Sequence, residues 1–246
     1  AKAAATFTQA TYTAVTTIGD AELNGLVAAQ SRGAGVDQMA IEISSKAKSV
    51  GRLLQTGIAT GDGVSPNLNS LHTLVDASQY TTASAGQALS LALLDELLDL
   101  VKAKDGEVDW IMMPARTLRS YKTLVRALGG VNETMAFTMP NGTTRNVSVY
   151  EGVPIFQNDY LSVTETANGA ALTTGALTSV YAGCWDDGSE KVGVGMIHPV
   201  AVEAGIAVEA VGAAETKDEQ IMRVKSYSNF AQFNRRGTAR LTSINN

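Results

Sequence analysis

The stretch from Leu89 to Leu161 constrains the fold most, because it sets helices and strands in a fixed order. Residues 87–104 carry leucines at helical spacing on more than one side, which predicts a helix with a wide buried face. Val108 to Met113 predicts a short buried strand, and Pro114 stands where a second helix, Ala115 to Leu128, can begin. The order predicts an α+β fold in which helices pack on a sheet.

A long amphipathic helix is predicted from Val36 to Thr60. Its apolar positions recur in steps of three and four: Val36, Ala40, Ile43, Ala47, Val50, Leu54 and Ile58. Gly61-Asp62-Gly63 is a strong stop signal. We therefore expect one stripe of this helix to face a core.

The remaining segments are predicted from composition and periodicity. Residues 5–17 predict an exposed β-ribbon, and Asp20 to Ser31 predicts a short helix. Residues 76–86 are small and polar and predict a connector, while 131–146 predict a loop or hairpin. Further strands are expected at 147–157, 176–185, 191–198, 200–213, 221–233 and 238–244.

The composition indicates a surface that is short of charge. Apolar residues make up 45% of the 246 residues and charged residues only 17%, below the usual quarter. Burial between subunits explains such a surface, and a poorly soluble or truncated monomer is the plainer alternative. The net charge of −5 gives no general basic face of the kind that clamps nucleic acid.

Catalytic and metal-binding patterns are missing from the sequence. Two distant histidines, His72 and His198, and one cysteine, Cys184, do not provide the spacing of a zinc site. No G-x-S-x-G elbow occurs, so a serine hydrolase lacks its nucleophile motif. No run of 18 apolar residues and no export signal are visible, so we expect no membrane contact. We expect neither an enzyme nor a bound cofactor.

Several motifs, in this order, resemble the major capsid proteins of tailed phages, the Hong Kong 97 phage fold. They are Ala4 to Tyr12, Val36 to Thr60 with Gly61-Asp62-Gly63, Ser70 to Val75, Leu94 to Leu98, Trp110 to Pro114, Gly152 to Ile155, and the strands from Val200 to Ile244. The resemblance implies an E-loop ribbon, a peripheral domain with a long spine helix, and an axial domain of sheet plus helices. It places the E-loop remainder and connector at 1–30, the peripheral domain at 31–80 and 200–246 with the spine helix at 36–60, and the axial domain at 81–199.

The resemblance also implies a function, which is self-assembly as pentamers and hexamers into an icosahedral shell around double-stranded DNA. Implied partners are copies of the chain, a portal, scaffold or protease, a cement protein, and DNA bound without sequence specificity. The location is the virion, with assembly in the host cytoplasm. Expected assembly contacts are Lys2, Phe7, Tyr12, Arg52, Arg235 and Arg236.

Some relatives cross-link their subunits through Lys and Asn with the help of Glu. Gln220 falls near the Asn position here and no Glu lies between Val224 and Phe230, so we expect non-covalent contacts. We expect salt bridges from the basic cluster Asn234-Arg235-Arg236 with Arg240 to an acidic loop of the same or a neighbouring subunit.

Three alternatives stay open at this point. An encapsulin-type nanocompartment shares the fold but encloses protein. An α/β hydrolase-like enzyme is more distant, because its catalytic set is missing. A bacterial surface-binding β-protein is opposed by the missing export signal.

Overall fold

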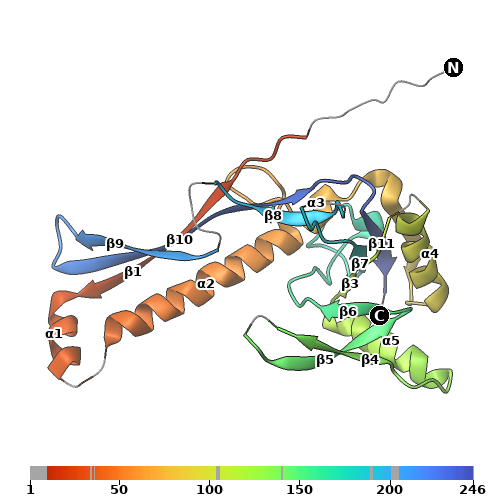
Figure 1. The fold of residues 1–246 in the computed structure, drawn as a ribbon, viewed down its shortest axis with the longest axis horizontal. Helices are drawn as coiled ribbons and strands as arrows, with labels where there is room; N and C mark the ends of the chain where they lie inside the picture. Colours follow the sequence, from red (N-terminus) through yellow and green to blue (C-terminus); the bar gives the residue numbers. More distant parts are fainter. Residues whose placement is uncertain are drawn as a thin grey trace. The chain divides into compact units, whose positions relative to one another are not determined.

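A computed structural model describes residues 10–33, 35, 37–103, 106–139, 141–188, 191–200 and 205–245. The chain divides into two compact units (Figure 1). The first combines the chain up to Gly51 with Met196–Ala231, and the second combines Arg52–Gly195 with Gln232–Asn246. The boundary falls inside the long helix α2 (Gln38–Thr60).

The first sheet is built around the long strand β10 (Glu219–Gln232). β1 (Val15–Asn24) runs antiparallel to it from Val15 opposite Ser228 to Asn24 opposite Glu219. β9 (Ala207–Ala213) is also antiparallel to β10, and β8 (Val194–Ile197) completes the sheet. α1 (Gly25–Gly33) follows β1 directly.

The two faces of this sheet differ, because side chains alternate along a strand. On one face Ala21 of β1 and Val224 of β10 are fully buried, and α2 lies close enough that a Cβ on Gly19 would be 3.1 Å from the Val50 side chain. The other face carries cross-strand ion pairs, in which Arg223 binds Asp20 at 2.9 Å and Lys225 binds Glu209. One face therefore packs against α2 and the other is solvated.

Helix α2 ends at Thr60 because Gly61 allows a close approach of the following loop. A Cβ on Gly61 would lie 2.1 Å from the Leu68 carbonyl oxygen. Gly63 then adopts a φ of +71°, which is in the left-handed region that favours glycine. The Gly-Asp-Gly stop signal is thus confirmed. Of the predicted apolar stripe, Val50 is fully buried, whereas Leu54 and Ile58 are only half-buried.

The second unit contains a seven-stranded mixed sheet in the order β2-β11-β7-β3-β6-β5-β4 (Figure 1). The strands are β2 (Tyr80–Gln87), β3 (Trp110–Met113), β4 (Thr134–Thr138), β5 (Thr144–Tyr150), β6 (Val153–Gln157), β7 (Thr178–Gly183) and β11 (Thr238–Ile244). β2 is parallel to β11 and β3 is parallel to β6, whereas the other neighbours are antiparallel. The short helices are α3 (Leu71–Leu74), η1 (Ala77–Gln79) and η2 (Ala167–Gly169).

Two helices, α4 (Leu91–Lys102) and α5 (Ala115–Ala127), share one hydrophobic core with this sheet. Ser90 caps α4 by accepting a hydrogen bond from the Leu93 backbone N–H, and Pro114 precedes α5 as predicted. The α4 leucines pack with Ile111 of β3 and Leu118 of α5 in this core. The predicted order of helix, strand, proline and helix is confirmed.

Three segments differ from the prediction. Residues 20–24 belong to β1 instead of the helix predicted over 20–31, because pairing with β10 outweighs local helix propensity. The connector predicted at 76–86 contains most of β2, which pairs with β11. The single strand predicted at 147–157 is two strands, β5 and β6, which pair antiparallel across a turn at Glu151 and Gly152.

Candidate assembly surfaces

The first unit leaves large apolar side chains exposed on most of its elements. They include Ile18 on β1, Leu26 and Val27 on α1, Ile41 on α2, Met196 on β8, and Ile206, Val208 and Val211 on or beside β9. Leu26 is 65% exposed. Isolated exposed apolar residues are ordinary. These lie on both faces of the sheet, because Ile18 is opposite Lys225 and Val208 is opposite Val224, so they indicate apolar area for more than one contact with another protein.

β9 is an edge strand with little cover. It pairs with β10, and six of its seven residues are exposed. Val208 and Val211 are each about half exposed, at 48% and 49%. Edge strands of this kind pair with other chains unless charge, a bulge or a neighbouring element protects them. β9 has two of these protections, since Glu209 lies on it and its pairing with β10 is irregular beside Val211, so the strand provides apolar area for a contact more readily than backbone groups.

The edge of the second sheet is similar. Every residue of β4 is exposed, including Met135 and Phe137. The Phe137 ring contacts Phe156 of β6 edge to face, with ring centroids 5.1 Å apart. Of the loop or hairpin predicted at 131–146, the structure shows the hairpin, formed by β4 and β5, and β4 presents apolar side chains at the margin of the sheet.

The predicted contact residues fall into different settings. Lys2 and Phe7 lie outside the described residues. Tyr12 is half-buried just before β1, where the Thr13 carbonyl accepts a hydrogen bond of 2.7 Å from the Asn229 side chain. Arg52 is exposed on α2. Their roles as assembly contacts stay predictions.

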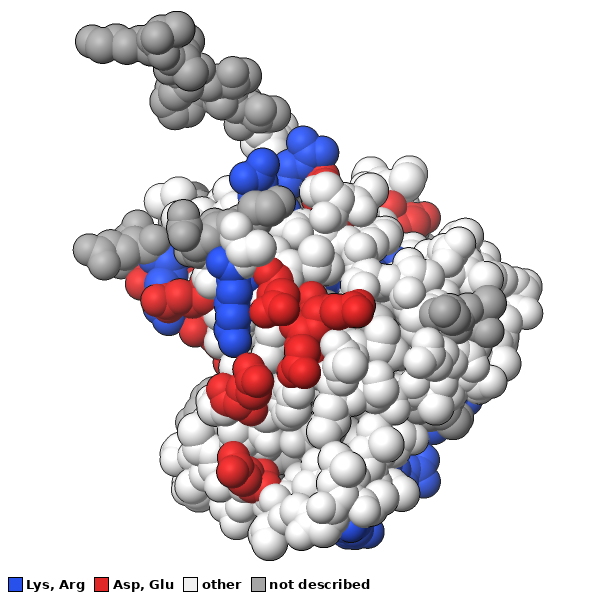
Figure 2. All heavy atoms as spheres, turned by 90° about the vertical axis from the view of Figure 1, so that its right-hand side faces the viewer, with Lys and Arg blue, Asp and Glu red and all other residues white. Residues whose placement is uncertain are grey.

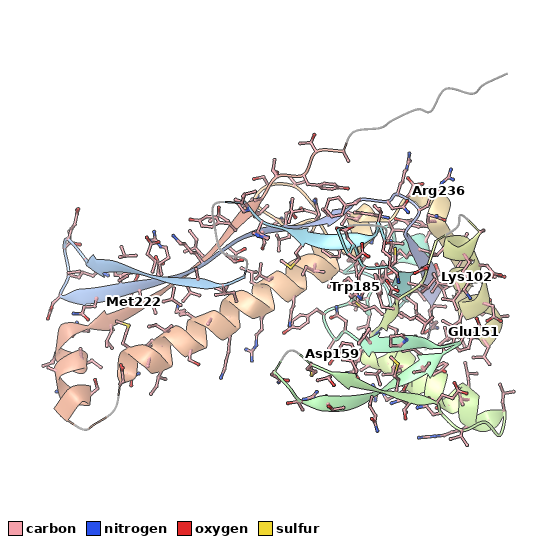
Figure 3. The ribbon with its side chains drawn as sticks, in the orientation of Figure 1. Lys102, Glu151, Asp159, Trp185, Met222 and Arg236 are labelled. Carbon is pink, nitrogen blue, oxygen red and sulfur yellow. The ribbon has the colours of Figure 1, made fainter. Side chains whose placement is uncertain are left out.

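Arg235 and Arg236 lie in the turn between β10 and β11. Arg235 forms an ion pair with Asp76 of the same chain, which is one of the two arrangements that we expected for this cluster. Hydrogen bonds from Ser78, together with the Arg235 guanidinium, lower the pKa of Asp76 to about 2. Arg236 is exposed and points away from the ribbon (Figure 3).

Arg240 of β11 does not belong to this surface cluster, because its side chain is buried in the interior of the second unit. Its side chain is 1% exposed and binds the 3%-exposed Glu165 carboxylate at 3.0 Å. Arg240 Nε also donates to Ser179 Oγ at 3.0 Å, and the guanidinium lies over the Tyr80 and Tyr181 rings. A buried ion pair with this many partners is a structural element of the fold.

The described residues contain no cluster of three or more His, Cys, Asp or Glu side chains that could hold a metal ion. Burial lowers the pKa of His72 to about 4, assisted by the Arg240 charge, and burial raises the pKa of the free Cys184 thiol. None of the helices in the described ranges is long and apolar enough to cross a membrane.

Solved structures that are similar to this chain include particle shells and a phage-related protein. The SrpI encapsulin of Synechococcus elongatus has a TM-score of 0.75 at 15% identity, over 94% of this chain and 74% of the encapsulin chain. The capsid of an empty GTA particle has a TM-score of 0.62 at 10% identity, over 94% of this chain and 74% of the GTA capsid chain. The capsid of Myoviridae Phage XM1 has a TM-score of 0.56 at 13% identity, again over 94% and 74%.

The chain has the Hong Kong 97 phage capsid fold. No sequence-family model matches it, and no curated protein matches it by sequence. The long helix α2 and the seven-stranded sheet with α4 and α5 agree with the long helix and the sheet plus helices predicted for this fold, whereas the residue bounds of the peripheral and axial domains stay predictions.

The sequence analysis did not predict one charged surface, which lies on helix α5 of the second unit. Helix α5 carries Arg116, Arg119, Lys122 and Arg126 and no acidic residue. Their spacing of three, three and four residues places them on one side of a helix, so the signal could have been found by reading charges with the same period as apolar residues.

Proposed function

We propose that this protein is a structural shell subunit, and not an enzyme, whose copies assemble into a closed particle. The observation that carries the proposal is the capsid fold combined with apolar side chains exposed on α1, α2, β1 and β9. Closed symmetry multiplies a modest contact into a stable particle, so each contact can be small. Copies of the chain are then its principal partners.

We further propose that the particle is a phage-type capsid, assembled from pentamers and hexamers around double-stranded DNA. The capsid of Phage XM1 and the GTA capsid, which share the fold, support this choice. In that setting the virion is its location and the host cytoplasm its place of assembly. A portal, scaffold or protease would act during assembly, and a cement protein could bind afterwards.

The encapsulin-type nanocompartment is the second candidate, because a specific observation favours it. The encapsulin has a TM-score of 0.75, against 0.62 and 0.56 for the GTA and XM1 capsids. An encapsulin-type shell would enclose protein instead of DNA, so the contents of the particle distinguish the two candidates.

Electron microscopy of particles purified from the native source tests both levels of the proposal. Shells whose contents absorb as nucleic acid, and whose DNA survives external nuclease, support the phage-type capsid. Shells that contain a second protein and no DNA support the nanocompartment. Material that forms no shell at any concentration contradicts the proposal as a whole.

A further inference from the structure

Helix α5 concentrates positive charge on one side. Arg116, Arg119, Lys122 and Arg126 fall within an arc of about 120° and along about 15 Å of the helix axis, at about 100° and 1.5 Å per residue. The opposite side holds the buried Thr117, Leu118 and Tyr121. Arg119 and Arg126 are exposed, whereas Arg116 and Lys122 are half-buried and Arg116 Nε is covered completely, so the charged side faces solvent mainly at Arg119 and Arg126.

The helix is held firmly in this orientation. Leu118 and Tyr121 belong to the hydrophobic core, and the Tyr121 hydroxyl donates a hydrogen bond of 2.9 Å to the Val149 carbonyl of β5. Arg145, exposed on β5, lies across from Lys122, and both side chains line a groove of about 300 Å³ between the helix and the β4–β5 hairpin. We call these five cations (Arg116, Arg119, Lys122, Arg126 and Arg145) the α5 basic stripe.

The α5 basic stripe has no counter-charge within the part of the chain that the structure describes. None of its five members forms an ion pair there; Arg116 and Arg119 only donate hydrogen bonds to the carbonyls of Ala176 and Ala115. Among the other described cations of the same unit, four bind a carboxylate (Lys102, Lys191, Arg235 and Arg240), whereas Arg52 and Arg236 form no ion pair. Figure 3 shows Lys102 beside its partner Glu151.

Uncompensated like charges at this spacing destabilise an isolated helix by about 0.2–0.5 kcal/mol per pair. The chain has a net charge of −5, yet this row of cations has no ion-pair partner among the described residues. The row can therefore bind an anion that belongs to another molecule. Figure 2 shows Asp and Glu atoms in several groups, some of them beside Lys and Arg atoms, and further Lys and Arg atoms at the lower right margin.

We propose that the α5 basic stripe binds the phosphate backbone of nucleic acid without sequence specificity, and that α5 therefore lines the inner wall of the shell. This inference rests on the proposed shell function. Duplex DNA carries one charge per about 1.7 Å, so 15 Å of helix faces about nine phosphates, more than enough to neutralise five cations. Because the chain has a net negative charge, the rest of the inner wall repels DNA weakly. DNA therefore contacts the wall only at the α5 basic stripe.

A second copy of the chain is the competing occupant, since α4 presents Asp95, Glu96 and Asp99. Two of these carboxylates already accept hydrogen bonds within the subunit, Asp95 from the Tyr150 hydroxyl and Glu96 from the Thr81 hydroxyl at 3.1 Å. A nucleic acid backbone offers free charges at high density, and we therefore favour it.

The test measures binding of a fluorescent duplex to unassembled full-length subunits between 50 and 200 mM salt. Five neutralised phosphates give a slope of about −4.5 in log K against log salt, which is a loss of about 500-fold over this range. The variant Arg119→Gln/Arg126→Gln removes two cations, so we expect a slope of about −2.7 and a loss of about 40-fold. Two duplexes of unrelated sequence should bind equally.

The control variant is Lys48→Gln/Lys217→Gln, which removes the same charge from two exposed lysines of the first unit and should keep the wild-type slope. Equal slopes for the two variants, or no binding by the wild type, would overturn the inference. So would an Arg119→Gln/Arg126→Gln variant that binds DNA normally but no longer assembles, because the stripe would then be a contact between copies. Failure of the shell proposal has a different signature: the wild type never assembles, whatever its slope with DNA.

Discussion

Replacing Leu26 tests whether the exposed apolar side chains of the first unit are buried between copies. Complete burial of a leucine is worth about 1.5–3 kcal/mol, so the 65% of Leu26 that is exposed in the subunit can contribute about 1–2 kcal/mol to each contact. Leu26→Asp loses this term and adds the cost of removing a carboxylate from water. We therefore expect the subunit concentration at which shells form to rise by about 5- to 30-fold or more.

The assay is light scattering of shell formation against subunit concentration, with Leu26→Met as the matched control because it keeps the apolar area. The subunit itself should unfold at nearly the same denaturant concentration in all three proteins, since substitutions at exposed positions usually change stability by less than about 0.5 kcal/mol. Shell formation by Leu26→Asp at the wild-type concentration would refute the reasoning.

Three further predictions concern the subunit alone. Arg240→Met leaves the Glu165 carboxylate buried without its partner and should lower the free energy of unfolding by about 3–5 kcal/mol in urea melts, whereas adding Glu165→Gln should recover part of the loss. The His72 pKa of about 4 lies below its ordinary 6.5, so the unfolded chain binds the proton more tightly than the folded chain. The contribution of His72 to the free energy of unfolding should therefore be complete above pH 6.5 and fall towards pH 4, by at most about 3 kcal/mol. The variant His72→Gln should flatten this pH dependence. Gly61→Ala forces a Cβ within 2.1 Å of a backbone oxygen and should cost about 1–3 kcal/mol, whereas Gly33→Ala, which has open space around it, should cost little; equal thermal melts would contradict this.

Helices of the second unit were predictable because their signals are local. Leucines at helical spacing in residues 87–104, Pro114 before α5, and Gly61 after α2 each act within a few residues. The structure places the corresponding elements within a few residues of the prediction. The order of elements was therefore sufficient to indicate the capsid fold.

Segments whose structure depends on distant partners were not predictable. Residues 20–24 are compatible with a helix by propensity, and only pairing with residues 219–223 makes them a strand. β2 has no large aliphatic residue and is mostly Thr, Ala, Ser and Gly, and it exists because β11, far along the chain, pairs with it. Asn24, whose side chain accepts a hydrogen bond from the Leu26 N–H, marked the true start of α1 and was a readable signal.

The candidate surfaces were harder to predict than the fold, because exposure is a property of the folded subunit. The sparse charge indicated that apolar area would be covered by other copies, but not that it would lie on α1 and β9. Grouping Arg240 with Arg235 and Arg236 followed their closeness in sequence, whereas β11 is buried along its whole length and therefore holds Arg240 in the interior. The α5 basic stripe was overlooked because its members are dispersed in the sequence and gather only on the helix.

Sedimentation velocity of the purified full-length chain, over a range of concentrations and salt, shows whether its copies assemble into a closed particle. We expect a discrete, rapidly sedimenting particle of many copies that forms above a threshold concentration. A single 25.7 kDa species that persists at every concentration and salt would contradict it.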